Sequence, residues 1–539
     1  MPKIVTVAQM RAIEKDADAT GLSYAQMMEN AGKAVADAMV KRLEEIKGRF
    51  VLLLVGSGNN GGDALVAGHY LAEAGAEVAA YLIKPIPGED PNLARLVERG
   101  LEIDIAEKDR GGRKLSAQIS KADAIIDGLL GTGFELPLRD SGKKFLSDVN
   151  MNLAKRSEAP FILAVDCPSG LECDTGEIAG EALHADLTVT FAAAKPGLLR
   201  FPGGGYVGEI QVANIGIEED QKELAKVNLE IASADMVRAW LPERPKDAHK
   251  GTFGRVVVVA GSINYPGAAA LAGLAAYRVG SGLVTMAVPG NIQGLIAAKI
   301  PEATWIVLPH ELGAIAESAV DVLGQELKGT TALLIGPGFG QDPSTAAFLK
   351  RLLSDQAGIA RGSIGFVGAE GKTSAEVGNL PPCIVDADGL KLLKKMEGWE
   401  QRLPSGSILT PHPGEMAVLT DEPKAAIQAD RVESVRKWAK QWGHVVVLKG
   451  AFTVIAAPDS RATVLPFATS ALAKAGTGDV LAGAIAGFRA QGVGAYEAAI
   501  LGAYVHAQAG IYAAQILGSE ASVLAGEVAE TIPYVMSEL

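Results

Sequence analysis

The residues best suited to chemistry form a short segment near the end of the chain, AGTGDVLAG at residues 475–483. Gly476 and Gly478 leave the backbone free to turn several N–H groups toward one anion, and a helix is predicted to begin at Asp479. Such a turn stabilises charge on a transferring phosphoryl group, and the Asp479 carboxylate would accept the proton of the attacking hydroxyl. The alternative, in which Asp479 only caps the helix, is disfavoured by the flanking Gly-Thr-Gly.

Other segments of the second half also place polar residues at predicted strand ends, among them LLIGPGFG, IVDADGL and LTPHPGE. In the last of these, two prolines pin a turn that presents His412 at the start of a helix. A lone histidine is usually structural, but the prolines and Glu415 favour a ligand contact. VVLKGAFTVIA offers Lys449, Gly450 and Thr453 between two strands, as a cradle for a nucleotide phosphate.

The first half contains its own glycine-rich turn, GSGNNGGDALVAG from Gly56, at the end of a predicted strand. Glycines let the backbone approach a phosphate, and the following helix N-terminus presents unpaired N–H groups. Asn59, Asn60 and Asp63 add oxygens that can hold a cation. For this segment alone, a tight turn with a capping Asp is an equally good interpretation.

Two later strand ends repeat this arrangement. Asp127 ends one predicted strand and precedes a glycine loop from Gly131 to Pro137, and Asp166 and Ser169 follow another strand. Ligands of open parallel sheets gather outside the carboxyl ends of the strands. Helix capping is the alternative for any single Asp, but three such strand ends together favour one shared site.

Alternating elements position these residues. Apolar runs of strand length, such as RFVLLLVG and RVVVVAGS, alternate with helical periodicity, as over residues 24–47. Strands that are apolar throughout belong to parallel sheets covered by helices on both faces. We therefore predict an α/β chain with a first domain at residues 1–225, a charged linker at 226–248 and a second domain at 249–539. The glycine-rich residues 355–380 predict a long surface loop.

The bulk composition agrees with two globular domains. A length of 539 residues exceeds what one hydrophobic core usually covers. The formal net charge of −13 argues against a nucleic-acid partner. The three cysteines lack metal-type spacing, and their odd number argues against a disulfide framework. We expect a soluble cytoplasmic protein without a membrane partner, because no apolar run of membrane-spanning length and no signal peptide is present.

Five segments of the first half resemble the NAD(P)H-hydrate epimerase family in order and spacing: MENAG, GSGNNGGDALVAG, IIDGLLGTG, VDCPSGLECDTG and FAAAKPGLL. The resemblance implies a Rossmann-like three-layer domain, and Ala64 stands where that family usually has glycine. It implies a potassium ion held by Asn60, Asp127 and Ser169, and a catalytic Asp166. The hydrate contacts that it implies are Asn59, Asn60, Gly61, Gly62, Asp63, Gly131, Thr132, Gly133, Phe134, Glu135, Leu136, Pro137 and Asp166.

The second half is similar to the ribokinase superfamily at AGTGDVLAG. More closely, it resembles the ADP- or ATP-dependent NAD(P)H-hydrate dehydratases through HKGTFG, GSINYPGAAALA, GPGFG, DADGL, LTPHPGE and LKGAFT. A ribokinase-like α/β domain is therefore implied, with Asp479 as its catalytic residue; Lys391 departs from the usual Asn. The implied hydrate contacts are Ala268, Gly338, His412 and Asp479. The implied nucleotide contacts are Lys449, Gly450, Ala451, Phe452, Thr453, Gly476, Thr477 and Gly478.

Together the two resemblances imply a bifunctional enzyme that repairs hydrated NADH and NADPH. The first domain would interconvert the R and S hydrates. The second would phosphorylate the hydroxyl of the S hydrate, using ADP or ATP with magnesium, after which phosphate leaves. The fusion of both domains favours ADP as the donor, and we expect a homo-oligomer.

Two other functions compete with this interpretation. One is a vitamin or hydroxymethylpyrimidine-type kinase with a Rossmann-like regulatory domain, and HKGTFG, LTPHPGE and the domain fusion count against it. The other makes the first domain a binding module, since related domains have been linked to apolipoprotein association. The presence of Asn60, Asp127, Asp166 and Ser169 argues against a catalytically inactive module.

Overall fold

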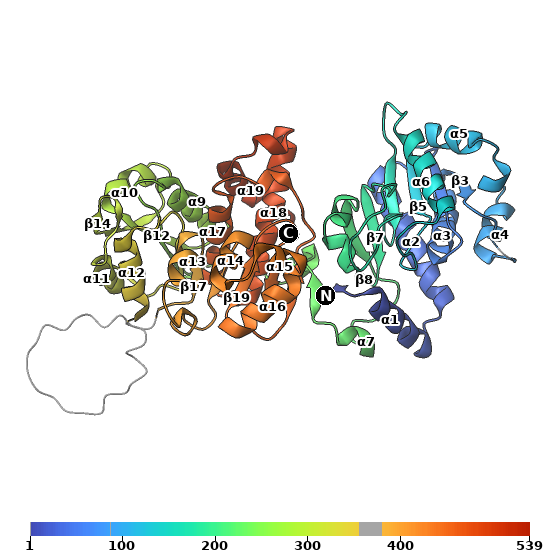
Figure 1. The fold of residues 1–539 in the computed structure, drawn as a ribbon. Coiled ribbons are helices and arrows are strands. Elements are labelled where there is room, and N and C mark those ends of the chain that lie inside the picture. Colours follow the sequence, from blue (N-terminus) through green and yellow to red (C-terminus); the bar gives the residue numbers. More distant parts are fainter. Residues whose placement is uncertain (1, 87, 355–379) are drawn as a thin grey trace, which may run out of the picture. The chain divides into compact units, whose positions relative to one another are not determined.

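The computed structural model describes residues 2–86, 88–354 and 380–539 (Figure 1). It divides into two compact units, Met1–Ile231 and Ala232–Leu539. The predicted surface loop at residues 355–380 lies outside the described residues except for its last position. Each unit is an α/β structure, as the alternating sequence pattern predicts.

The first unit is built on a seven-stranded sheet whose neighbouring strands all run parallel. Strand β2 is buried along its whole length, as expected for a strand covered on both faces. The strand order reverses between β2 and β5, the point at which open α/β sheets bind ligands. In sheet order the strands are β4 Glu102–Ile105, β3 Glu77–Leu82, β2 Phe50–Val55, β5 Ala124–Gly128, β6 Phe161–Val165, β7 Leu187–Phe191 and β9 Glu209–Ala213.

Helices cover both faces of this sheet. Alternate residues of β2 enter two separate cores: Val51 and Leu53 pack with α2 and α3, whereas Leu52 and Leu54 pack with α5 and α6. The result is the Rossmann-like three-layer arrangement that the sequence predicts. The helices are α1 Val7–Ala19, α2 Tyr24–Leu43, α3 Asn59–Glu73, α4 Pro91–Glu98, α5 Arg113–Lys121, α6 Asp140–Leu153 and α7 Lys222–Ala225.

Three very short strands complete the first unit. Strand β1, Lys3–Ile4, pairs antiparallel with β10, Leu229–Ile231, and parallel with β8, Ala193–Ala194. The segment that leaves β8 continues directly into Lys195. These pairings tie the beginning of the unit to its last strand and to the chain that carries Lys195.

The sheet of the second unit is parallel from β13 to β19 and antiparallel at β20 and β21. Its strands in sheet order are β13 Thr304–Leu308, β12 Leu283–Pro289, β11 Arg255–Val259, β16 Ala332–Ile335, β17 Cys383–Val385, β18 Ile408–Leu409, β19 Val445–Leu448, β20 Val454–Ala456 and β21 Ala462–Val464. Strands β14 His310–Glu311 and β15 Ala314–Ile315 form a separate hairpin.

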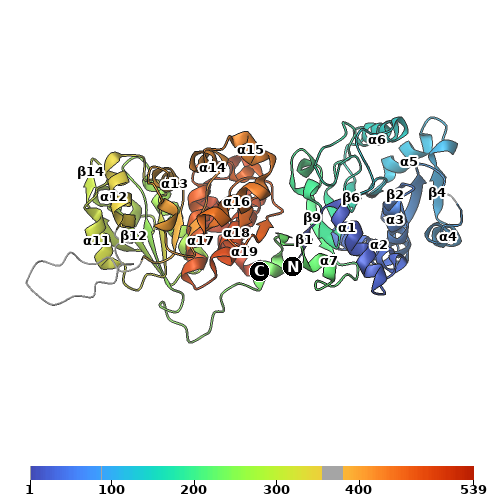
Figure 2. The ribbon, with the colours of Figure 1, turned by 60° about the horizontal axis from the view of Figure 1, so that its bottom comes forward.

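Helices α9, α17, α18 and α19 pack together on one face of this sheet, and Figure 2 shows α17, α18 and α19 next to one another. The helices of the unit are α8 Ala234–Arg238, α9 Pro266–Arg278, α10 Gly290–Ala297, α11 Ala319–Glu326, α12 Pro343–Ser354, α13 Asp388–Leu393, α14 Pro413–Thr420, α15 Lys424–Ala429, α16 Arg431–Trp442, α17 Thr477–Ala490, α18 Ala495–Leu517 and α19 Ala525–Glu538. Of the helices in the described ranges, none combines the length and hydropathy needed to span a membrane.

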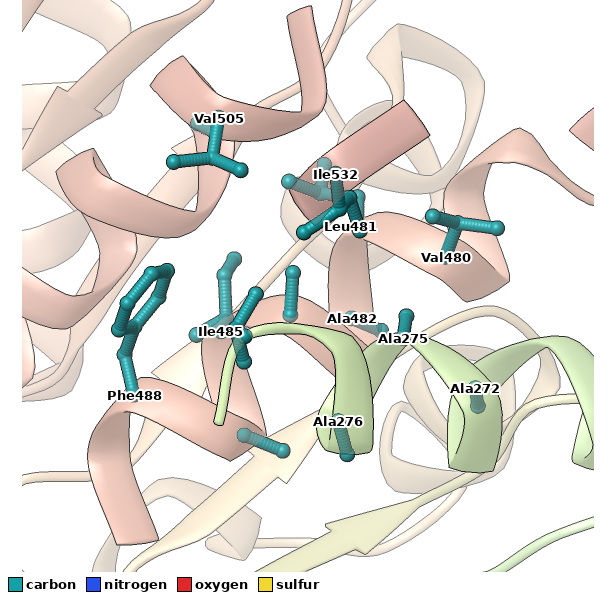
Figure 3. Close-up of a cluster of buried hydrophobic side chains, with 14 of the residues drawn as sticks. Ala272, Ala275, Ala276, Val480, Leu481, Ala482, Ile485, Phe488, Val505 and Ile532 are labelled. Atoms are coloured by element: carbon teal, nitrogen blue, oxygen red, sulfur yellow. The ribbon is translucent and has the colours of Figure 1, made fainter. Parts of the chain in front are cut away.

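The packing of α17 against α9 places the start of α17, which carries Asp479. Figure 3 shows small side chains of α9, including Ala272 and Ala276, facing apolar side chains of α17 such as Ile485. The two backbones approach so closely that a Cβ added at Gly483 would lie 2.1 Å from the carbonyl oxygen of Ala272. Only glycine fits at this crossing.

We predict that Gly483→Ala destabilises the second unit by about 1–3 kcal/mol, because the added methyl forces two packed helices apart. Gly526→Ala in α19 is the matched control, since a Cβ there meets nothing within 4 Å. It should be neutral or stabilising by up to about 1 kcal/mol through helix propensity. Thermal and denaturant unfolding of the two variants provides the measurement. Equal stability of both variants would contradict the close-packing argument.

Candidate functional site

In the first unit, the turn after β2 brings Asn60 into the interior. Helix α3 begins at Asn59, so Asn60 lies in its first turn, and its side chain is only 8% exposed. Its Nδ2 donates to the carbonyl oxygens of Val165 at 2.5 Å and Leu130 at 3.4 Å. Its Oδ1 lies so near the next loop that a Cβ on Gly131 would be 2.0 Å away. Two predicted site segments therefore meet at this amide.

Asp127 and Ser169 lie beside that amide and are fully buried. The Ser169 hydroxyl donates to Asp127 Oδ1 at 2.5 Å, the Ser169 N–H donates to Oδ2 at 2.7 Å, and the Leu130 N–H donates to the Ser169 hydroxyl at 3.0 Å. Burial raises the pKa of Asp127 to about 6, and the bonds from Ser169 act in the opposite direction. Among the described residues, no basic side chain pairs with Asp127.

These three side chains fit a cation. They offer amide, carboxylate and hydroxyl oxygens, a hard donor set without sulfur or imidazole that suits an alkali or alkaline-earth ion better than a transition metal. A fully buried carboxylate without a basic partner is also expensive unless a positive charge compensates it. Asn60 Oδ1 receives no hydrogen bond from the part of the chain that the structure describes.

Asp166 follows β6 and is held by one of its two carboxylate oxygens. Its backbone has a φ of 64°, which is unusual for a residue other than glycine. Oδ1 accepts from the Thr190 hydroxyl at 2.8 Å, the Phe191 N–H at 3.2 Å and Lys195 Nζ at 2.5 Å. Lys195 is itself 1% exposed. Lys195 lies in the segment FAAAKPGLL, for which the sequence predicted no individual functional residue.

Two further carboxyl groups lie near this ion pair. Burial, followed by the charges of Asp166 and Glu14, raises the pKa of Asp63 well above its usual range, and Lys195 acts in the opposite direction. The pKa of Glu14, on α1, is also raised, first by burial. Asp63 was predicted as a hydrate contact, whereas Glu14 was not singled out from the sequence.

The remaining predicted contacts of the first unit surround this centre. Gly61 and Gly62 lie in the first turn of α3 beside Asn60, and Gly62 approaches Met28 of α2. Residues 131–137 begin next to the Asn60 side chain, which Gly131 approaches, and are partly or fully exposed. Ala64, the departure from the family pattern, is fully buried against Gly128 of β5, on the sheet side of α3.

In the second unit, Lys449 forms the centre of a buried polar cluster. Its Nζ lies 2.6 Å from Asp386 Oδ1 and 3.6 Å from Glu415 Oε2. The Thr410 hydroxyl donates to the same Asp386 oxygen at 2.7 Å. Burial acts to lower the pKa of Lys449, but the charges of Asp386 and Glu415 outweigh it, so that the pKa lies above its usual value. This lysine is therefore charged at the end of β19.

Asp479 stands in the first turn of α17, next to this cluster. Gly476, with a φ of 93°, precedes the helix, which begins at Thr477 rather than at Asp479 as the sequence predicted. Burial and the charge of Asp386 raise the pKa of Asp479 to about 7, and Lys449 acts in the opposite direction.

His412 has a structural role as well as an exposed edge. Its Nδ1 accepts from the Gly414 N–H at 2.9 Å and the Glu415 N–H at 3.2 Å, while Glu415 accepts from the His412 N–H at 2.9 Å. The pair forms a reciprocal cap at the start of α14. Burial lowers the pKa of His412, and about half of its side chain is exposed. Capping fixes the ring, and its Nε2 lies 3.4 Å from Glu415 Oε1.

The predicted hydrate contacts Ala268 and Gly338 are neighbours in the structure. A Cβ on Gly338 would lie 2.9 Å from that of Ala268, and Gly338 has a φ of 66°. The same loop is held to the DADGL segment, since the Gly340 N–H donates to Asp388 Oδ2 at 3.0 Å. Lys391, the unusual residue of this segment, forms an ion pair with Asp388 at 3.0 Å.

A pocket of about 200 Å³ opens beside Asp479 and contains most of the predicted nucleotide contacts. Its lining includes Lys449, Gly450, Ala451, Thr453, Thr477 and Gly478, together with the apolar residues Leu465, Phe467, Leu472, Leu481, Ala503 and Ala507. Phe452 and Gly476 are not part of this lining. His506 of α18 is, and sequence reasoning missed it because α18 reads as an apolar, alanine-rich helix.

A helix start preceded by a left-handed glycine, a carboxyl group with a pKa of about 7 and a charged lysine beside an apolar pocket are the kinds of group that a nucleotide-dependent phosphoryl-transfer site uses. Each unit also matches a known protein family. Residues 24–197 match the model described as YjeF-related protein N-terminus, and residues 256–364 and 372–534 match the model described as NAD(P)H-hydrate dehydratase. The chain belongs to the family of bifunctional NAD(P)H-hydrate repair enzymes.

Similar proteins span nearly the whole chain. The bifunctional NAD(P)H-hydrate repair enzyme Nnr of Moorella thermoacetica is 36% identical, over 99% of this chain and 97% of its own length. The enzyme of the same name from Escherichia coli is 32% identical, over 88% of this chain and 82% of its own. The ADP/ATP-dependent NAD(P)H-hydrate dehydratase structure of Bacillus subtilis, co-crystallised with ATP/Mg²⁺, is 33% identical, with a TM-score of 0.46, and covers 57% of this chain and 98% of its own.

The position of Asp479 generates a pH prediction. A proton acceptor must be ionised, and its pKa of about 7 means that it is mostly protonated below neutral pH. We expect kcat/KM for nucleotide-dependent dehydration of the S hydrate to rise roughly tenfold per pH unit up to about pH 7, and then to level off. Initial rates of NADPH recovery at limiting substrate provide the profile. A rate that is flat from about pH 5.5 to 8.5 would exclude Asp479 as the titrating base.

Proposed function

We propose that the first unit interconverts the R and S hydrates of NADH and NADPH, and that the second dehydrates the S hydrate at the expense of ADP. Family membership supports the two activities as a pair, since the chain aligns with fused repair enzymes over nearly its full length. The observation that carries the second activity is the Asp479 carboxyl at the glycine turn, next to the pocket formed by Lys449 and its neighbours.

In the second unit, the hydrate hydroxyl and the donor phosphate would meet at Asp479. The carboxylate takes the hydroxyl proton as the oxygen attacks the terminal phosphorus, and the N–H groups at the start of α17 stabilise the moving phosphoryl group. Phosphate then leaves the carbon beside the ring nitrogen, and loss of a neighbouring proton restores the dihydronicotinamide. Ala268, Gly338 and His412 would contact the hydrate.

The donor would occupy the pocket beside the segment from Lys449 to Thr453. Its apolar wall suits an adenine base, and Lys449 and Gly478 suit its phosphates. A magnesium ion bound with the donor would neutralise the charge of its phosphates during transfer. We favour ADP over ATP because the chain resembles the fused repair enzymes.

In the first unit, a potassium ion would lie among Asn60, Asp127 and Ser169. It would supply the positive charge that the buried Asp127 lacks, and orient a substrate oxygen. Asp166 would then move protons to or from the oxygen that the hydroxyl-bearing carbon carries. The hydrate contacts would come from the start of α3 and from residues 131–137.

We further propose that residues 1–225 and 249–539 are separate catalytic domains joined by residues 226–248. The boundary between the two compact units falls within that segment. A homo-oligomeric, cytoplasmic enzyme is the form in which we expect these activities to work, because its substrates are cytoplasmic cofactors.

We predict that Asp127→Ala abolishes potassium-dependent epimerisation, because the cation site loses its only carboxylate among the three proposed ligands. Dehydration of pure S hydrate should be unchanged. Chromatographic R-to-S interconversion, measured with potassium and with sodium, provides the test. Asp37→Ala, at an exposed position on α2, is the matched control. Equal loss of both activities in a folded variant would contradict the assignment of separate sites.

We predict that Asp479→Asn lowers dehydration by at least roughly 10²–10⁴-fold, because general-base assistance is lost while size and capping ability remain. Nucleotide binding and epimerisation should persist. Recovery of cofactor absorbing in the near ultraviolet, with and without ADP or ATP, gives the rate, and calorimetry gives nucleotide affinity. Asp235→Asn, at an exposed position on α8, serves as the control. Near-normal dehydration in Asp479→Asn would reduce Asp479 to a helix cap.

A further inference from the structure

The carboxylate of Asp166 is held from one side only. All three of its hydrogen bonds end on Oδ1, from Thr190, Phe191 and Lys195. No donor in the described ranges reaches Oδ2, and this oxygen is not sealed from solvent. The chain therefore fixes the orientation of the carboxylate through one oxygen and leaves the other for a ligand.

Lys195 is the residue that makes this orientation possible. It is 1% exposed, and its Nζ is fully engaged by Asp166 Oδ1, the Thr190 hydroxyl at 3.1 Å and the Phe191 carbonyl at 3.3 Å. A buried ammonium with all its donors satisfied has none to spare for substrate. Its function at the site is to supply charge and position to Asp166.

Asp63 lies near the same pair but in a different environment. It projects from α3, whereas Asp166 follows β6, so the two carboxyls reach the site from different elements. Asp63 is 6% exposed and accepts no hydrogen bond from the described residues. Burial, Asp166 and Glu14 of α1 together hold its pKa well above the usual range, although Lys195 acts in the opposite direction. Asp63 thus favours its protonated form, whereas Asp166 has Lys195 as a counterion.

We propose that Asp63 is the proton donor of epimerisation, that Asp166 Oδ2 is the proton acceptor, and that Lys195 is the positioning residue that divides these roles. The assignment deepens the epimerase activity proposed for this unit and rests on it. Two carboxyls in contrasting environments are the usual way for a site to perform acid and base chemistry at one pH.

The proton balance of the reaction then closes on these two groups. The Asp63 proton passes to the substrate hydroxyl, the C–O bond breaks, water departs, and the ring nitrogen lone pair forms a C=N bond. A water molecule then adds to the opposite face of that carbon and gives one proton to Asp166 Oδ2. The product has the inverted configuration, and the two carboxyls return to their starting states by exchange with solvent or by a turnover in the reverse direction.

The test compares the pH profile of epimerisation in the full chain and in Lys195→Met, Lys195→Arg and Thr190→Val. Loss of the buried positive charge disfavours the ionised acceptor, so Lys195→Met should lower the rate by at least tenfold and move its acidic limb to higher pH. Lys195→Arg should retain part of the rate and part of the original position of the acidic limb. Thr190→Val keeps the charge pair but loses the hydroxyl that donates to Asp166 and accepts from Lys195, so it should lower the rate without moving the limb. Near-ultraviolet circular dichroism verifies folding of each variant.

A second comparison tests Asp63 directly. Asp63→Asn should lose roughly 10²–10⁴-fold in epimerisation, because the amide cannot donate an acidic proton. Asp18→Asn, on the exposed face of α1, should be unchanged, and dehydration of S hydrate should be normal in every variant. A folded Lys195→Met or Asp63→Asn enzyme with an unaltered rate and profile overturns the assignment. Absence of interconversion by the unaltered chain overturns the proposed epimerase itself.

Discussion

A lysine placed inside a protein loses its hydration, and each unit of this chain places one against an aspartate at a strand end. Lys195 pairs with Asp166 at 2.5 Å, and Lys449 pairs with Asp386 at 2.6 Å. Removing one partner of such a pair typically costs about 3–5 kcal/mol, because the other charge is left unpaired in the interior. In each pair a threonine hydroxyl, from Thr190 or Thr410, also donates a hydrogen bond to the aspartate and so helps to compensate its burial.

Burial also affects the carboxyl groups that have no basic partner, because it disfavours their charged form. Asp479 and Asp63 stand beside the paired aspartates, and burial raises the pKa of each. Both units thus combine a carboxylate with its own counterion and a carboxyl that ionises less readily. In the second unit the latter group, Asp479, has a pKa of about 7 and is the proposed proton acceptor. In the first unit the pKa of Asp63 lies well above its usual range, and Asp63 is the proposed proton donor.

Local sequence predicted most of the α/β elements, because apolar strands and glycine turns leave clear patterns. Asn60, Asp127 and Ser169 could be grouped from the sequence because they lie at the ends of strands that are adjacent in the sheet, and their role as cation ligands stays a prediction. Strand β9, with its alternating exposure at the sheet edge, has no such pattern and was not predicted. Lys195 was missed for a different reason. In AAAKPG nothing local indicates burial, and its partner lies 29 residues earlier.

The geometry of the second unit accounts for phosphoryl transfer, and the chemistry of the substrate accounts for the subsequent loss of phosphate. A kinase acting on a stable alcohol would need the same turn, the same Asp479 and the same lysine. In the hydrate, however, the phosphorylated oxygen is attached to a carbon beside the ring nitrogen, whose lone pair expels phosphate. Such an enzyme would need no additional acid for the leaving group. In the proposed site, contacts near Gly338, Ala268 and His412 would select the hydrate and so make a dehydratase of a kinase-type site.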